Sequence, residues 1–132
     1  MSNRNPVTWL GHWRNQYGSE LTITDDSGQR LRGTFRTALG DSAFAGTEAE
    51  ITGIHVGDCV QFAFSRSGPG GDAIASFTGL LRDGRMETMW HVIADSAVKP
   101  PRPGQAPELI KLPWAHAAMT NADTFQRVRR PA

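Results

Sequence analysis

A short segment near the amino terminus, residues 11–19, combines side chains that could build a pocket for a small molecule. Trp13, Asn15 and Ser19 are separated by even intervals, so on an extended strand that turns at Gly18 they point to one side. That side would carry an aromatic wall and two hydrogen-bonding groups. The alternative is structural, because Trp often fills a core while Asn and Ser often serve turns.

Eight strands are expected to position these residues, because short alternating runs are broken by Gly, Asp, Ser and Pro throughout the chain. In residues 30–37, Leu31 and Phe35 share one side and three arginines lie on the other, which predicts a strand with one solvated face. The expected strands cover residues 8–14, 19–24, 30–37, 48–53, 58–65, 73–81, 86–94 and 124–129.

Two turns indicate how these strands connect. Residues 25–28 and 82–85 are rich in turn formers, and the Asp-Gly pair of the second is a strong hairpin signal because it tolerates positive φ. We therefore expect an antiparallel meander. Closing the sheet removes its exposed edges, so the predicted fold class is all-β, an eight-stranded antiparallel up-and-down β-barrel. An open β-sandwich is the alternative.

The length and composition of the chain limit the classes of protein to which it can belong. Its 132 residues suit a single domain over residues 1–132, and a net charge of +1 recommends neither a nucleic-acid nor an anionic-membrane partner. No apolar run could span a membrane, and the amino terminus lacks the apolar core of a signal peptide. No metal-ligand spacing is present, and the lone Cys59 is expected to be a buried structural thiol.

Four further motifs accompany residues 11–19 in a fixed order, at residues 33–37, 77–79, 88–90 and 121–125. Together they make the sequence similar to the avidin and streptavidin family of biotin-binding proteins, from about Trp9 to Val128. The resemblance implies a closed barrel with the ligand inside. Because family members are usually exported, it also suggests a secreted or periplasmic protein, although the sequence itself leaves localisation open.

The resemblance implies which side chains would contact the ureido ring of biotin. A cyclic urea needs donors for its carbonyl, acceptors for its two N–H groups and apolar walls. By resemblance, Asn15 and Ser19 donate to the carbonyl and Asp123 accepts from one N–H, while Thr37 or a main-chain carbonyl in residues 37–41 accepts from the other. The expected walls, each with core packing as its alternative, are Trp13, Leu39, Phe64, Phe77, Trp90 and Val92.

Several positions depart from the family pattern, and most of them lose a hydroxyl. Phe35 stands where the family has a Tyr that completes the donors, and Ala73 and Ala75 replace a Ser and a Thr that contact the carboxylate and the sulfur. Asp41 replaces an Asn over the tail, and Phe64 replaces a Trp. Three lost hydrogen bonds weaken binding by roughly 3–6 kcal/mol, or about two to four decades, so we expect the valerate tail to be held weakly.

Residues 97–113 interrupt the strand pattern with prolines, which cannot donate ladder hydrogen bonds. We predict a long, polyproline-like insertion, either solvated or acting as a lid or interface arm. Trp114 follows it. In tetrameric family members a Trp near this position enters the neighbouring subunit's site, and packing under the proline-rich loop is the alternative. The resemblance implies a homotetramer, with a dimer as the other option.

A barrel cavity could instead carry acid and base groups, as in a lipocalin-like enzyme. The candidates would be His91, His116, Asp41 and Asp123. No pair has motif spacing, His91 should face outward, and His12 and His55 are expected to be surface or turn residues. We therefore expect a non-catalytic biotin-binding protein without a cofactor or metal. The alternative is an avidin-like barrel that binds a different small apolar or cyclic-urea ligand, or a protein.

Overall fold

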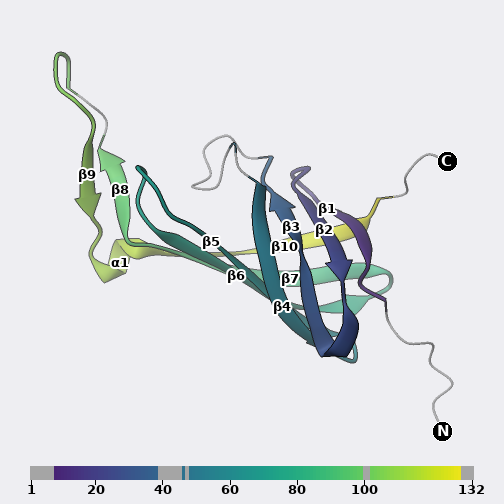
Figure 1. Ribbon diagram of the computed structural model, residues 1–132. Coiled ribbons are helices and arrows are strands. Elements are labelled where there is room, and N and C mark those ends of the chain that lie inside the picture. The colour runs from purple at the N-terminus through teal and green to yellow at the C-terminus, as the bar shows by residue number, and fades with distance from the viewer. Residues whose placement is uncertain (1–7, 39–45, 47, 100–101, 129–132) are drawn as a thin grey trace, which may run out of the picture.

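The computed structural model describes residues 8–38, 46, 48–99 and 102–128, and eight of its strands close into an antiparallel barrel (Figure 1). The order around the barrel is β1-β10-β7-β6-β5-β4-β3-β2, so β1 and β10 close the sheet. The predicted fold class is confirmed. The strands are β1 Gly11–Asn15, β2 Glu20–Asp25, β3 Arg30–Arg36, β4 Glu48–Val56, β5 Cys59–Arg66, β6 Ala73–Arg82, β7 Arg85–Ala94 and β10 Ala118–Arg127.

The core fills the barrel because alternate residues of every strand face inward. Aromatic rings dominate its middle, where Phe62 and Phe77 stack with their centroids 4.8 Å apart and Phe125 meets Phe77 edge-on at 6.0 Å. The alternation also corrects one expectation. Cys59 is exposed rather than buried, since Val60 and the other inward residues of β5 leave it on the outer face.

One end of the barrel, where the β2–β3, β4–β5 and β6–β7 turns lie, is closed by aromatic side chains. Trp9 and Trp13 are fully buried, and the Trp13 Nε1 donates a hydrogen bond to the Trp9 carbonyl at 3.0 Å. The Trp9 amide donates to the Asp26 carboxylate at 2.9 Å, and His55 Nε2 donates to the Asp26 carbonyl at 2.7 Å. His55 is therefore a half-buried residue of the closed end and not a surface histidine.

The first and last strands of the barrel are tied together at this closed end. The Val128 amide donates to the His12 carbonyl at 2.9 Å, and the Arg127 guanidinium lies 4.2 Å from the centroid of the Trp13 ring. Arg127 also donates to the carbonyls of Leu10 and Thr8. Burial lowers the pKa of Arg127 from its usual value.

Two glycines allow neighbouring strands of the barrel to approach closely. A Cβ atom on Gly33 of β3 would lie 1.9 Å from the Thr22 carbonyl oxygen, and one on Gly79 of β6 would lie 2.0 Å from the Glu87 carbonyl oxygen. No side chain fits at either distance without moving backbone. These positions therefore hold β3 against β2, and β6 against β7.

The last strand begins earlier than the sequence pattern predicts, at Ala118 and not at residue 124. It pairs with β7 from Ala118 opposite Ile93 to Gln126 opposite Arg85. This long pairing outweighs the low strand propensity of its Asn and Asp residues, because strand preference depends strongly on tertiary context. Similarly, β4 continues beyond residue 53 to Val56, since its end pairs with the start of β5.

The expected loop over residues 97–113 contains regular structure at both ends. Strands β8, Ser96–Lys99, and β9, Glu108–Lys111, pair as a separate hairpin that projects from the barrel, and the short helix α1, Trp114–Ala117, lies at its base (Figure 1). The prediction was wrong there because the prolines lie between the two strands or, in the case of Pro113, after them, and not within them. Within the described ranges, no helix has the length and apolar character needed to cross a membrane.

Candidate functional site

The candidate site lies at the opposite, open end of the barrel and begins with the β1–β2 turn. Asn15 ends β1 and Ser19 precedes β2, with the Gly18 amide donating to the Asn15 carbonyl at 3.0 Å. The Asn15 side-chain Oδ1 accepts from the amides of Tyr17 at 3.0 Å and Ser19 at 2.9 Å. These two bonds fix the orientation of the Asn15 amide, so its Nδ2 is directed away from the turn.

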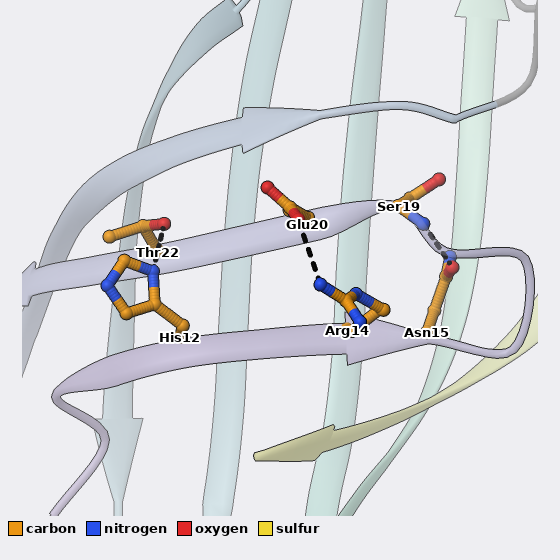
Figure 2. A network of polar contacts seen from close by, with 6 residues as sticks. All are labelled: His12, Arg14, Asn15, Ser19, Glu20 and Thr22. Atoms are coloured by element: carbon orange, nitrogen blue, oxygen red, sulfur yellow. Dashed lines mark hydrogen bonds and ion pairs between the residues drawn. The ribbon is translucent and has the colours of Figure 1, made fainter. Parts of the chain in front are cut away.

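Contacts on the outer face of the same hairpin hold its register. Figure 2 shows His12 beside Thr22 and Arg14 beside Glu20, at 3.0 and 3.1 Å, with Asn15 and Ser19 at the turn. Because successive side chains alternate between faces, these outer pairs place Trp13 and Asn15 on the inner face. Trp13 and Asn15 of residues 11–19 therefore share one face of the strand, as their even spacing predicts.

Asp123 meets Asn15 from the other side of the barrel seam. The Asn15 Nδ2 donates to Asp123 Oδ2 at 3.0 Å, and both residues are 7% exposed. Gln16 Nε2 donates to Asp123 Oδ1 at 3.2 Å, and the Thr88 hydroxyl donates to the Asp123 main-chain carbonyl at 2.8 Å. A carboxylate has about four acceptor positions, so Asp123 retains capacity for a further N–H donor.

Ser19 and Thr37 extend this polar group along the rim. The Ser19 Oγ accepts from the Ala38 amide at 2.9 Å and lies 3.5 Å from Thr37 Oγ1. Ser19 is only 2% exposed. Since its oxygen is held by the Ala38 amide, the hydroxyl hydrogen of Ser19 remains able to donate elsewhere.

An aromatic layer lies beside these polar side chains. Phe35 stacks on Phe64 with centroids 4.7 Å apart, Phe77 lies 5.7 Å from Phe35, and Trp90 lies 6.4 Å from Phe77. The Trp90 Nε1 is buried and has no hydrogen-bond partner in the described part of the chain. Ala73 and Ala75 are buried, and Val92 is half-buried opposite Ala75 on β7. The structure therefore brings these sequence-predicted wall residues to the same end as the polar group.

Other sequence-predicted residues lie elsewhere or cannot be placed. Leu39 and Asp41 fall outside the described residues. Trp13 is fully buried against Trp9, as its core-packing alternative predicts. Trp114 on α1 is 74% exposed, and it lines a hollow at the ends of β5 and β6 together with the predicted site residue Ala73.

The acid and base candidates are not gathered into one site. His91 and His116 are exposed, so among the described candidates only Asp123 is buried. No group of three or more His, Cys, Asp or Glu residues within the described ranges could hold a metal ion.

Sequence reasoning missed three contributors to this end of the barrel. Gln16 braces β10, because its Oε1 accepts from the Thr124 amide at 3.0 Å while its Nε2 contacts Asp123. Thr88 holds the Asp123 backbone through its hydroxyl, whereas the sequence pattern predicts a wall residue only at Trp90 of residues 88–90. Arg66 lines a hollow of about 640 Å³ at the mouth, between the ends of β5, β6 and β7 and the segment carrying α1. Pairing across strands, which no local pattern shows, is what assembles all three.

A closed eight-stranded barrel with a few polar side chains gathered at its open end defines a class of small-ligand-binding barrels. Within that class, residues 3–100 match the model of the Avidin family, and the chain belongs to this family. No match was found among curated proteins.

Solved avidin-like structures share the fold of this chain. The bradavidin2–biotin complex is similar at a TM-score of 0.66 and 20% identity, covering 93% of this chain and 100% of that one. Apo shwanavidin is similar at a TM-score of 0.68 and 19% identity, covering 95% of this chain and 100% of that one. The rhizavidin–biotin complex is similar at a TM-score of 0.69 and 18% identity, covering 95% of this chain and 96% of that one. At these identities the likeness concerns the fold.

Proposed function

We propose that this protein is a non-catalytic binder of biotin that holds the ureido head through Asn15, Ser19 and Asp123. The observation that carries the proposal is the buried hydrogen bond between Asn15 and Asp123, 3.0 Å long, at the open end of a barrel whose interior is otherwise mainly apolar. A buried polar pair beside aromatic walls suits a ligand that is flat, neutral and rich in hydrogen-bonding groups. Biotin complexes of two avidin-like proteins with this fold support the choice of ligand.

The donors and acceptors match a cyclic urea atom by atom. Asn15 has a second N–H on Nδ2, and Ser19 has its hydroxyl hydrogen, so two donors serve the ureido oxygen. Asp123 accepts from one ligand N–H, and Thr37 or a main-chain carbonyl in residues 37–41 accepts from the other. Phe64, Phe77, Trp90 and Val92 form the apolar walls, to which we add Leu39 from the adjoining segment.

Affinity in this proposal is lower than in typical family members. Phe35 supplies no third donor to the ureido oxygen, because its ring stacks on Phe64 and carries no hydroxyl. Ala73 and Ala75 offer no hydroxyl to the tail or the sulfur, and the family resemblance implies that Asp41 would place a negative charge near the tail. The same losses favour the second candidate, an avidin-like barrel for a different small apolar or cyclic-urea ligand.

The proposed assembly is a homotetramer, with a dimer as the alternative. Large apolar side chains are exposed on the outer faces of β6 and β7, including Ile74, Met89 and Ile93. Trp114, which is 74% exposed in the single chain, would enter the site of a neighbouring subunit. Light scattering at micromolar concentration should return four chains, two chains would support the dimer, and one would contradict both.

Calorimetry with biotin, desthiobiotin and biotin amide tests the proposed ligand. All three contain the ureido ring, so all three should bind, and desthiobiotin should lose only the contacts of the sulfur. Retention on biotin-agarose that free biotin elutes gives a qualitative check. Absence of heat and of retention, with a folded protein, would reject biotin and leave the different-ligand candidate.

A further inference from the structure

Arg66 lies at the mouth of the barrel, where it lines the hollow at the ends of β5, β6 and β7. It is the last residue of β5 and lies on the same face as Phe62 and Phe64, because strand residues two apart share a face. Its backbone is opposite Ala73 on β6. Two strand positions correspond to about 6.6 Å, so Arg66 stands one layer above Phe64 and the aromatic walls.

The guanidinium of Arg66 has little engagement with the protein. Its Nη2 donates to the Gly70 carbonyl at 3.5 Å, the outer limit for such a bond, and its Nε is buried with no hydrogen-bond partner among the described residues. Within the same part of the chain Arg66 forms no ion pair. A buried, unpaired N–H of a charged group is unfavourable, and guanidinium matches a carboxylate with two parallel hydrogen bonds.

The surroundings of Arg66 leave room for such a carboxylate. Arg66 lines the hollow of about 640 Å³ together with Ala73 and Ala94, whose methyl groups occupy little space. Two acidic residues also line it, but both have other partners. The Asp72 Oδ1 accepts from the Ser67 hydroxyl at 2.7 Å, and the Asp95 carboxylate is paired with Lys111 and accepts from Ser96. Neither of them forms an ion pair with Arg66 in the described part of the chain, although the neutral Ser67 hydroxyl leaves the negative charge of Asp72 in the same hollow.

We propose that Arg66 binds the carboxylate of the ligand's valerate tail and takes over the role of the hydroxyl lost at Ala73. This inference rests on the proposed function. It also reverses the expectation of a weakly held tail, because a hydrogen bond to a charged partner is stronger than one to a neutral hydroxyl. Recognition at the mouth is then electrostatic and selects an anionic tail.

Calorimetry on Arg66→Gln with biotin and with biotin amide tests the inference. The variant should bind biotin about 10- to 100-fold more weakly, whereas the neutral amide should change by less than about threefold. Arg85→Gln is the matched control, because it removes the same charge from an exposed residue at the closed end, and it should bind both ligands like the parent. Equal changes for biotin and its amide in Arg66→Gln would overturn the inference.

The parent protein provides a second test that does not depend on the folding of a variant. It should bind biotin about 10-fold or more tightly than biotin amide, and the difference should shrink in high salt, which screens a partly exposed ion pair. Equal affinities for the two ligands would overturn the role of Arg66 while leaving biotin binding intact. Failure of both ligands to bind would instead overturn the proposed function, on which the inference rests.

Discussion

Replacing Asp123 by Asn is the sharpest perturbation of the proposed ureido contacts, because it preserves shape and exchanges one acceptor for a donor. The two carboxylate oxygens of Asp123 accept from Asn15 at 3.0 Å and from Gln16 at 3.2 Å. Neither partner can rotate its amide to compensate. The Asn15 Oδ1 is held by the Tyr17 and Ser19 amides, and the Gln16 Oε1 is held by the Thr124 amide. One donor must therefore face another donor in Asp123→Asn.

The magnitude follows from the bonds that change. A hydrogen bond to a charged group contributes about 1.5–3 kcal/mol, so loss of the charged acceptor for the ligand N–H should raise the dissociation constant for biotin by about 10- to 150-fold. The free energy of unfolding without ligand should fall by about 1–3 kcal/mol. One hydrogen bond to the buried side chain at position 123 is lost, and the amide N–H of Asn15 or Gln16 is left without an acceptor.

Calorimetry and urea unfolding measure these two effects separately. Asp83→Asn is the matched control, because Asp83 is an exposed turn residue at the closed end whose φ of 52° suits Asn equally well. The control should leave both quantities unchanged. A folded Asp123→Asn variant with the parent's dissociation constant would refute the placement of the ligand against Asp123. Equal weakening in the control would show that net charge, and not this contact, controls affinity.

Three further outcomes are expected. Phe35→Tyr should tighten biotin binding by about 0.5–1.5 kcal/mol, because the new hydroxyl adds a third donor at the ureido oxygen. A dissociation constant that calorimetry finds unchanged would reject this role for position 35. Gly33→Ala should lower the free energy of unfolding by about 1–3 kcal/mol through its clash with β2, whereas exposed Thr52→Ala should change it by less than about 0.5 kcal/mol in urea titrations. The amide protection factors of the β8–β9 hairpin, which correct exchange rates for their intrinsic pH dependence, should be constant near neutral pH and decrease on either side, because pairing lowers the pKa of Asp95 and raises that of Lys111. Its stabilisation is lost as pH falls through the Asp95 pKa or rises through the Lys111 pKa, and a flat profile would contradict this.

The barrel could be predicted because the sequence signals that determine its strands and turns lie within short segments of the chain. Alternating residues and Gly-containing turns determine the strands, and a closed sheet satisfies them all. The even spacing of Trp13, Asn15 and Ser19 likewise places them on the inner face, and the family resemblance names Asp123 as their companion. In the structure Asn15 and Asp123 meet across the β1–β10 seam, and their role toward a ligand stays a prediction.

Most of what the sequence could not show depends on long-range pairing. The early start of β10 follows from pairing with β7, which outweighs Asn and Asp as local signals. The β8–β9 hairpin is a local pairing that was missed because prolines fill the segment between its strands. Burial of His55 follows from contacts with the β2–β3 turn and Trp9. Arg66 lies outside every motif, so its unpaired Nε became visible only once the mouth of the barrel was assembled.

The pairing of β1 with β10 brings residues 8 and 128 to the closed end, opposite to the mouth. A fused domain attached at either of these residues would therefore leave the mouth accessible, which suits the chain to immobilisation or display. The same proximity permits circular permutation. A linker between residues 8 and 128 and new termini at the Asp83–Gly84 turn would place every engineered junction on the closed side.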